Sequence, residues 1–282
     1  MDDQIVTVAA VQLTSGSDRE TNVERAISLI ERACDEGATY IQLPEYFNYY
    51  GPLRNYPAVA EPIPGPTTLR LSELAKKRRV TIHVGSMLER DPTSDKCFNT
   101  SVLINPIGDV VATYRKVHLF DVEVPGDVAY LESRAIAPGQ AIVVAPLPWC
   151  NLGMTICFDL RFPALYRELA LRGATVVAIP SAFNANTGRA HWEILVRARA
   201  IENHVFVIAA AQVGTTAEGL SSYGHSMIVG PWGEVLRESP LDAEDVLVAT
   251  IDIGEVTRRR SQIAVLALQR GDLYGLRVDT DE

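Results

Sequence analysis

Apolar and polar positions change along the chain in blocks that predict strands and helices in turn. Unbroken apolar runs at 5–13 (IVTVAAVQL) and 38–45 (ATYIQLPE) predict strands that are buried on both faces. Between them, residues 22–37 carry apolar side chains on one helical face and end at Gly37, which predicts an amphipathic helix with a glycine stop. A helix over 67–79 and a strand over 80–90 follow. This alternation is typical of an α/β protein.

The middle of the chain predicts a β-hairpin, because residues 98–106 and 108–120 are strand-like and flank turn chemistry around NPIGD. Further strands are predicted over 141–148, 150–158, 175–183, 205–213, 224–231 and 245–253, with helices over 162–174 and 190–204. The loop over 121–140 is long enough to suggest a function. Since no linker or repeat divides the chain, we expect one mixed α/β domain over 1–255 and a C-terminal tail over 256–282 that contributes to oligomer contacts.

Composition narrows the function classes. With 282 residues, 47% of them hydrophobic, the chain can bury a sizeable core, and its net charge of −9 argues against nucleic-acid or anionic-membrane partners. The N-terminus is acidic where a signal peptide would be basic, and its apolar run is too short to span a bilayer. The four cysteines follow no disulfide or metal spacing. We therefore expect a cytosolic protein with reduced thiols.

The chain has no dinucleotide-binding glycine motif, no phosphate-binding P-loop, no zinc-protease motif and no G-x-S-x-G elbow. We therefore predict neither a cofactor nor a metal. The five histidines are scattered, and a Cys/His pair formed with His118 or His191 stays open at this point.

Three reactive side chains come directly after apolar, strand-like runs. They are Glu45 after YIQLP, Lys116 in TYRKVHL and Cys157 after GMTI. Strand ends are where α/β proteins assemble their sites, and a charge there is costly unless it is paired. A lysine ammonium would shift a nearby thiol towards thiolate, and a glutamate would accept the thiol proton. The set predicts acyl transfer; the alternative is a Glu45–Lys116 salt bridge beside a core cysteine.

The chain resembles the nitrilase superfamily of carbon–nitrogen hydrolases. The matching segments are LPEYF, YRKVHLFDVEVPG, GMTICFDLRFP, PSAFNANTGRAHWEILVRARAIEN and YGHSMIVGPWGEV, in that order over most of the chain. The resemblance implies a four-layer α-β-β-α sandwich that docks as a homodimer or a higher homo-oligomer. It also implies Glu45 as general base, Cys157 as nucleophile and Lys116 as the cation facing the oxyanion, aided by the Phe158 N–H. Glu132 stands where this family usually has a second glutamate; its alternative is a solvated loop carboxylate.

Within the superfamily, FDVEVPG, CFDLRFP and NTGRAHWE are similar to the branch of omega-amidases and deaminated-glutathione amidases, with a lean to omega-amidase. Phe158 and Asp159 replace the tryptophan and glutamate that usually follow the cysteine in true nitrilases, which argues against a nitrile substrate. The favoured substrates carry a carboxylate, which Arg161 can bind bidentately. Its alternative partners within the chain are Asp159 and Glu168.

The remaining expectations concern the walls of the site and the competing function classes. We expect Phe183 and Thr187 to form the wall beside Arg161, and Tyr49 with Tyr50 to cover the mouth. A simple aliphatic amidase or a nitrilase is a weaker enzyme alternative, and a carbamoyl-amide hydrolase fits these motifs less well. A metal hydrolase and a silent binding protein on the same fold are the alternatives from other classes.

Overall fold

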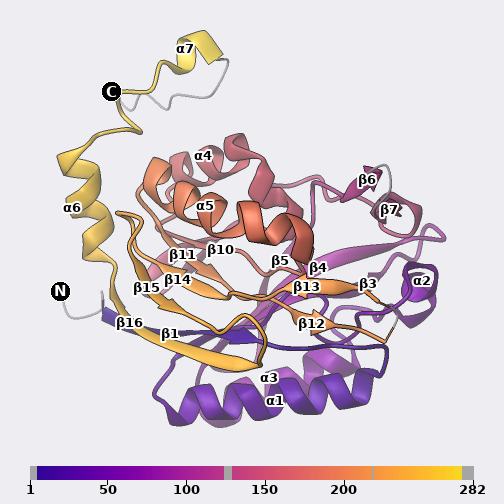
Figure 1. Cartoon of the computed structure of the whole chain (residues 1–282). Helices are drawn as coiled ribbons and strands as arrows, with labels where there is room; N and C mark the ends of the chain where they lie inside the picture. Colours follow the sequence, from indigo (N-terminus) through magenta and orange to yellow (C-terminus); the bar gives the residue numbers. More distant parts are fainter. Residues whose placement is uncertain (1–4, 124–128, 218, 275–282) are drawn as a thin grey trace.

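The computed structural model describes residues 5–123, 129–217 and 219–274, and it contains two six-stranded sheets stacked face to face (Figure 1). The first sheet has the strand order β16-β1-β2-β3-β4-β5 and the second has the order β15-β14-β11-β10-β9-β8. Helices α1 and α3 cover the outer face of the first sheet, and α4 and α5 cover the outer face of the second (Figure 1). The predicted four-layer α-β-β-α sandwich is confirmed.

The first half of the chain supplies five strands of the first sheet. Strands β1, β2 and β3 are parallel, β4 and β5 extend the sheet as antiparallel hairpins, and the distant β16 pairs antiparallel with β1. The elements are β1 (Ile5–Gln12), α1 (Arg19–Asp35), β2 (Tyr40–Gln42), η2 (Leu53–Asn55), α2 (Tyr56–Val59), α3 (Pro66–Arg78), β3 (Thr81–Arg90), β4 (Cys97–Ile104), β5 (Val110–Arg115) and β16 (Asp245–Asp252). The predicted hairpin around residues 105–109 is therefore present.

The second half repeats this plan. Strands β9, β10 and β11 are parallel, and β8, β14 and β15 are antiparallel to their neighbours. The elements are β8 (Val144–Leu147), β9 (Cys150–Met154), η4 (Cys157–Arg161), α4 (Pro163–Leu171), β10 (Val176–Ala178), α5 (Ala185–Asn203), β11 (Phe206–Ala209), β14 (Met227–Val229) and β15 (Val235–Glu238). Two small ribbons and the C-terminal helices complete the described chain: β6 (Asp121–Glu123) with β7 (Ala129–Leu131) and η3 (Glu132–Arg134), β12 (Val213–Thr215) with β13 (Ser221–Tyr223), α6 (Gly254–Gln262) and α7 (Gly271–Tyr274).

Strand β1 shows why the apolar runs are continuous. Val8 and Ala10 pack into the core between the two sheets, whereas Ala9 and Val11 pack against the α1 and α3 layer. Successive side chains of a strand point to opposite faces, so a strand covered on both faces must be apolar at every position. The sandwich thus follows from the same pattern that predicted the strands.

Several element bounds differ from the prediction for local reasons. Helix α1 begins at Arg19 because the Asp18 carboxylate accepts the Thr21 N–H at 2.8 Å, and α5 begins at Ala185 because Asn184 caps it in the same way. Strands β2 and β9 end before the predicted strands do, so Glu45 and Cys157 lie in the turns that follow them. The domain boundary proposed at 255/256 falls inside α6, which packs onto the core through a buried valine.

Candidate active site

A close crossing of two backbones places Glu45. A side chain on Gly85 of β3 would lie 1.9 Å from the Leu43 carbonyl oxygen, so only glycine lets the segment before Glu45 pass over the strand. Ser86 then holds the turn, because its N–H donates to the Pro44 carbonyl and its hydroxyl accepts from the Tyr46 N–H. Glu45 therefore leaves β2 on a segment that is fixed on β3.

Lys116 is placed in the same way at the end of β5. Its N–H donates to the Asn99 carbonyl on β4 at 2.9 Å, and its own carbonyl accepts from the Gly139 N–H at 2.8 Å. A side chain on Gly139 would meet the Arg115 carbonyl oxygen at 2.0 Å, so a glycine is needed there too. The backbone on both sides of the lysine is thus tied down, and its side chain is buried.

Cys157 stands at a sharp turn between β9 and the short helix η4. Its φ of 45° lies in the left-handed region that non-glycine residues rarely adopt, and its N–H donates to the Pro180 carbonyl at the end of β10 at 2.9 Å. Such strained turns are a recurrent way to hold a nucleophile. The neighbouring strand end therefore fixes the direction of the thiol.

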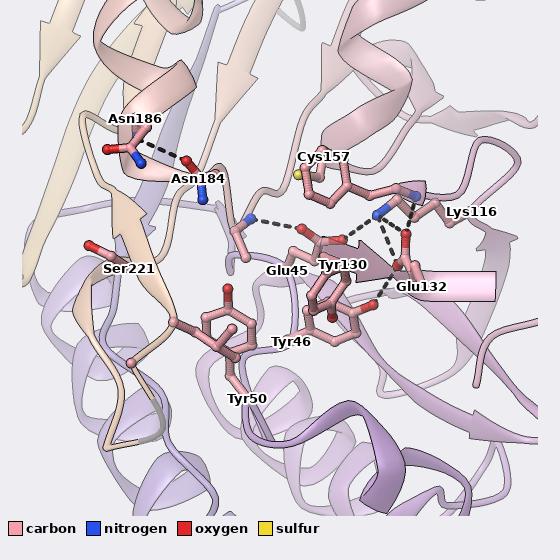
Figure 2. A pocket seen from close by; sticks show the side chains of 14 residues that line it. Glu45, Tyr46, Tyr50, Lys116, Tyr130, Glu132, Cys157, Asn184, Asn186 and Ser221 are labelled. Atoms are coloured by element: carbon pink, nitrogen blue, oxygen red, sulfur yellow. Dashed lines mark hydrogen bonds and ion pairs between the residues drawn. The ribbon is translucent and has the colours of Figure 1, made fainter. Parts of the chain in front are cut away.

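The three side chains meet in one buried cluster, shown in Figure 2. Lys116 Nζ lies 2.9 Å from Glu45 Oε1, and 3.0 and 2.9 Å from the two carboxylate oxygens of Glu132. The other oxygen of Glu45 accepts the Ala182 N–H at 2.7 Å. Cys157 lies beside Glu45 and is itself 8% exposed. The Glu45–Lys116 ion pair named in the structural alternative is present, and the thiol lies next to it.

Glu132 is a buried member of this cluster, so the alternative of a solvated loop carboxylate is wrong. Only 1% of the residue is exposed, and its carboxylate also accepts the Tyr46 hydroxyl and the Phe120 N–H, both at 2.6 Å. Each donor offsets part of the cost of burying the charge. Glu132 thereby holds the lysine and one tyrosine of the pocket wall together.

The electrostatics of the cluster correct one prediction. Burial raises the pKa of the Cys157 thiol, and the charge of Glu45 and its hydrogen bond with the thiol raise it further; the Lys116 ammonium opposes this without reversing it. We had expected the lysine to favour thiolate, but the carboxylate is the stronger neighbour. For Lys116, burial works against the charged form, yet Glu132 and Glu45 outweigh it and raise the pKa. The resting site therefore pairs a neutral thiol with an ammonium.

Two cavities meet at Cys157. The larger has a volume of about 290 Å³ and runs past the Glu45–Lys116 pair. Its wall consists of Tyr46, Tyr50, Phe120, Tyr130, Glu132, Ala182, Asn184, Asn186, Gly219, Leu220 and Ser221 (Figure 2). The smaller, of about 20 Å³, shares Cys157 with the first and is lined by Phe120, Phe158, Arg161, Ala182, Phe183, Asn184 and Thr187. The larger cavity therefore has space for a small substrate at the sulfur, and the smaller one places Arg161 near the same sulfur.

Four predicted binding residues, Phe158, Arg161, Phe183 and Thr187, line the smaller cavity together. The guanidinium of Arg161 lies 4.9 Å from the centre of the Phe183 ring, and its Nη1 donates to His191 Nδ1 at 3.2 Å. Among the residues that the structure describes, no carboxylate pairs with Arg161, since Glu168 binds Arg172 instead. The predicted position of Arg161 at the start of a helix is wrong, because Arg161 is the last residue of η4.

Asp159, the other suggested partner of Arg161, has a different role. Its buried carboxylate accepts hydrogen bonds from the Tyr114 hydroxyl at 2.7 Å and from the Ile156 N–H at 2.9 Å. The other oxygen lies 3.1 Å from the His118 N–H and 2.7 Å from His118 Nδ1. His118 and His191 are thus engaged by Asp159 and Arg161, and neither pairs with the thiol of Cys157.

One predicted site residue is misplaced. Tyr49 is absent from the described walls of both cavities; it packs edge-on against Tyr56, and its hydroxyl accepts from the Asn55 amide at 3.2 Å. Its neighbour Tyr50 lines the larger cavity, as expected. The positive φ of Tyr46 turns the chain just after Glu45, which decides the direction of the tyrosines that follow.

Sequence reasoning missed several residues of the cavity wall. Tyr46 directly follows the motif glutamate, and Asn184 and Asn186 lie inside a quoted motif, so proximity to a motif was an available signal. Tyr130 and Ser221 carried no such signal. They come from the two small ribbons, β6–β7 and β12–β13, which were not predicted as strands.

In the described part of the chain, no group of three or more His, Cys, Asp or Glu side chains is arranged to hold a metal ion. None of the helices in the same residues has the length and apolarity needed to cross a membrane.

Comparison with known proteins places the chain in a family. The family model of the carbon–nitrogen hydrolases matches residues 7–261. The chain is 39% identical to the human omega-amidase NIT2 over 269 residues, which cover 95% of this chain and 96% of that protein. Among solved structures, the NitFhit protein of C. elegans is similar with a TM-score of 0.91 and 38% identity, covering 97% of this chain and 67% of that one.

A third similar protein is an amidase of the nitrilase superfamily from Nesterenkonia sp. AN1. One of its structures shows covalent addition of the acetamide moiety of fluoroacetamide at the active-site cysteine. That structure has a TM-score of 0.82 and 25% identity, and the match covers 98% of this chain and 97% of that one. By the family match, the identity and the shared fold, this chain belongs to the carbon–nitrogen hydrolases of the nitrilase superfamily and is a hydrolase that acts on amides.

Proposed function

We propose that this enzyme hydrolyses the C–N amide bond of a small substrate that carries a carboxylate, and that it does so through a thioester on Cys157. The observation that carries the proposal is that a general base with a cation, and a separate group able to bind a carboxylate, both lie near the Cys157 sulfur. The Glu45–Lys116 pair lies on one side of Cys157, and an arginine without a carboxylate partner in the described chain lies on the other.

The first half of the reaction forms the thioester. Because the thiol is neutral at rest, Glu45 takes its proton as the sulfur attacks the amide carbonyl. The carbonyl oxygen becomes an oxyanion, which faces the Lys116 ammonium and the Phe158 N–H. The tetrahedral intermediate then collapses, and Glu45 returns the proton to the departing nitrogen, which leaves as ammonia.

The second half releases the acid. Glu45 accepts a proton from a water molecule that attacks the thioester, and the same oxyanion site stabilises the second tetrahedral intermediate. Cys157 leaves as the thiol after recovering the proton from Glu45, and the product departs as a carboxylate. The covalent cysteine adduct of the Nesterenkonia amidase supports the same role for the sulfur in this chain.

The substrate is proposed to be an omega-amide of a 2-oxo acid, of the 2-oxoglutaramate or 2-oxosuccinamate type. Arg161 lines the smaller cavity, and its fork of N–H donors would bind a carboxylate bidentately. Phe183 and Thr187 line the space between. The activity printed in the name of the human relative, omega-amidase, supports this choice.

Deaminated glutathione is the second candidate substrate. The larger cavity, of about 290 Å³, extends from the sulfur away from Arg161 and offers space for a leaving amine bigger than ammonia. A leaving group with peptide bonds would meet the polar side chains of Asn184 and Ser221 there. The cavity alone does not rank the two substrates.

A substrate panel tests the proposal. We expect the purified enzyme to hydrolyse 2-oxoglutaramate with a higher kcat/KM than deaminated glutathione, simple aliphatic amides or nitriles, measured by ammonia or carboxylate release. Cys157→Ala should abolish turnover and keep the fold, since the change removes little volume. Mass spectrometry of quenched wild-type enzyme should find the acyl group on the Cys157 peptide. An adduct on another residue, or turnover by Cys157→Ala above a few per cent, would refute the mechanism.

We further propose that the enzyme works in the cytosol with reduced thiols, as a homodimer or a higher homo-oligomer. Its four cysteines are free in the structure, which fits the first point. Helix α7 stands clear of the sandwich (Figure 1). Several large apolar side chains, near the C-terminus and in α5 and the loop after β14, are exposed. They are Ile194, Ile201, Trp232, Leu268 and Leu273. A second copy of the chain would cover these side chains. Deletion of residues 263–282 should therefore dissociate the oligomer into monomers, measured by sedimentation.

A further inference from the structure

Asn99 lies inside the charged cluster, although it lines neither of the two cavities as described. It is fully buried on β4, and its amide Nδ2 lies 2.9 Å from Glu45 Oε1 and 3.4 Å from Glu132 Oε1. These are the same two oxygens that Lys116 Nζ contacts at 2.9 and 3.0 Å. One neutral amide therefore bridges the two carboxylates in parallel with the ammonium.

The chemistry of the neighbours sets the orientation of this amide. With the opposite orientation, the amide oxygen would face two carboxylate oxygens and repel both. In the observed orientation, Asn99 Oδ1 is buried without a hydrogen-bond partner among the described residues. An unsatisfied buried oxygen is costly. The Asn99 side chain leaves its oxygen unsatisfied, and in this orientation its N–H groups donate to the Glu45 and Glu132 carboxylates.

The bridge has a consequence for Glu45. Its Oε1 is engaged by Lys116 and Asn99, whereas its Oε2 accepts one backbone N–H, from Ala182. A carboxylate oxygen has two lone pairs, so Oε2 keeps capacity for the thiol proton. When the ammonium turns towards an oxyanion, its hold on the two carboxylates weakens. The Asn99 amide is neutral and lines neither cavity, so an oxyanion in either cavity gives it no reason to move.

We propose that Asn99 is a positioning residue, which holds the Glu45 and Glu132 carboxylates together and keeps Glu45 aimed at the Cys157 thiol during turnover. The proposal rests on the proposed function, since Glu45 acts there as the general base. Several titratable groups face the bridged carboxylates. They are Lys116 from the segment after β5, Cys157 from η4, Tyr46 and Tyr50 from the turn after Glu45, Tyr56 from α2, Cys97 from β4 and Tyr130 from β7.

Asn99→Leu tests this role, because it keeps the size of the side chain and removes the donor. We expect kcat to fall roughly 10- to 100-fold, the range for one hydrogen bond to a charged group, while KM changes little. We also expect the acidic limb of the kcat/KM profile to move to higher pH, because loss of a hydrogen-bond donor to a carboxylate disfavours its charged form. Asn99→Asp adds a third carboxylate and should move the acidic limb of the kcat/KM profile further towards higher pH.

Alkylation gives a readout that needs no turnover. The rate at which iodoacetamide modifies the Cys157 peptide, followed by mass spectrometry against pH, should show the same shift. The matched control is Asn203→Leu, since Asn203 is also buried with an unpartnered Oδ1 and an amide that donates, at 3.0 Å, to the Arg199 carbonyl in α5. This control should lower thermal stability without moving either pH profile.

The outcomes separate this inference from the proposed function. If Asn99→Leu folds and both pH profiles coincide with those of the wild type, Asn99 is structural and the inference is wrong. If Asn99→Leu does not fold, Asn99→Ser, which is too short to bridge both carboxylates, should show the same shift. Turnover by Cys157→Ala would overturn the proposed function instead, and the alkylation profile would still report on Asn99.

Discussion

At the scale of single residues, Glu45, Lys116 and Cys157 act on one another at contact distance. We expect Glu45→Gln and Lys116→Met each to lower kcat on the order of 10²-fold or more, since each removes a proton-transfer or oxyanion interaction. The double variant should lose much less than the product of the two effects, because groups that act as a unit are not additive. Steady-state kinetics of the four enzymes measure this; independent, multiplying losses would contradict a shared role.

Arg161 makes a prediction about selectivity. Arg161→Met should lower kcat/KM for carboxylate-bearing amides by about 10²-fold, or roughly 3 kcal/mol, as expected when one partner of a buried charge pair is removed. Neutral aliphatic amides never used that interaction and should change much less. The ratio of the two losses is the quantity to measure, because it cancels general damage to the site. Equal losses would mean that Arg161 is structural and that the carboxylate is recognised elsewhere.

At the scale of elements, the Asp159 carboxylate joins the segment after β5 to the turn after β9. Tyr114 and His118 lie two positions on either side of Lys116, and Ile156 precedes Cys157, so Asp159 ties the lysine segment to the nucleophile turn. Asp159→Asn keeps the shape but exchanges one acceptor oxygen for a donor that faces other donors. We expect lower thermal stability and a kcat reduced roughly tenfold or more with little change in KM.

The control for this variant is Glu168→Gln, in which the ion pair with Arg172 on the surface of α4 is removed instead. Such an exposed pair contributes little, so both stability and turnover should stay close to the wild type. A folded Asp159→Asn enzyme with full kcat would show that the joint is dispensable for catalysis.

At the scale of the whole molecule, burial of tyrosine and cysteine sets the alkaline limit of stability. Burial raises the pKa of seven tyrosines and of three buried cysteines: Tyr40, Tyr46, Tyr50, Tyr56, Tyr114, Tyr130, Tyr166, Cys97, Cys150 and Cys157. Above the ordinary pKa of each group, the unfolded chain loses protons that the folded chain keeps, so the free energy of unfolding falls as pH rises. The loss of stability begins near the ordinary cysteine pKa of 9.0 and steepens above the ordinary tyrosine pKa of 10.0.

We therefore expect the Tm to be level up to about pH 8.5 and to fall steeply between about pH 9 and 11. Over that range the free energy of unfolding should fall by on the order of 1 kcal/mol per pH unit for each group. Tyrosinate absorbance at 295 nm should rise together with unfolding followed by circular dichroism. Gradual ionisation of these tyrosines in a folded protein would contradict the prediction.

The amino-acid sequence by itself determined the fold class and the order of most elements, and it singled out three side chains, Glu45, Lys116 and Cys157, that the structure brings together. These features have local signals: a doubly buried strand is apolar at every position, and Glu45, Lys116 and Cys157 each follow such a run inside a family motif. The starts of α1 and α5 also have a local signal in the sequence, because each helix begins directly after a capping residue, Asp18 or Asn184.

Only the tertiary structure decided which side chains meet and how they are charged. Asn99 sits in an ordinary-looking strand, and it reaches the cluster because β4 lies beside the ends of β3 and β5. Tyr49 and Tyr50 are neighbours in the chain, yet one packs away from the cavity and the other lines it. The direction of the Cys157 pKa shift depends on burial and on the competition between Glu45 and Lys116. Local patterns encode which faces are buried, whereas these outcomes depend on distances between segments far apart in the chain.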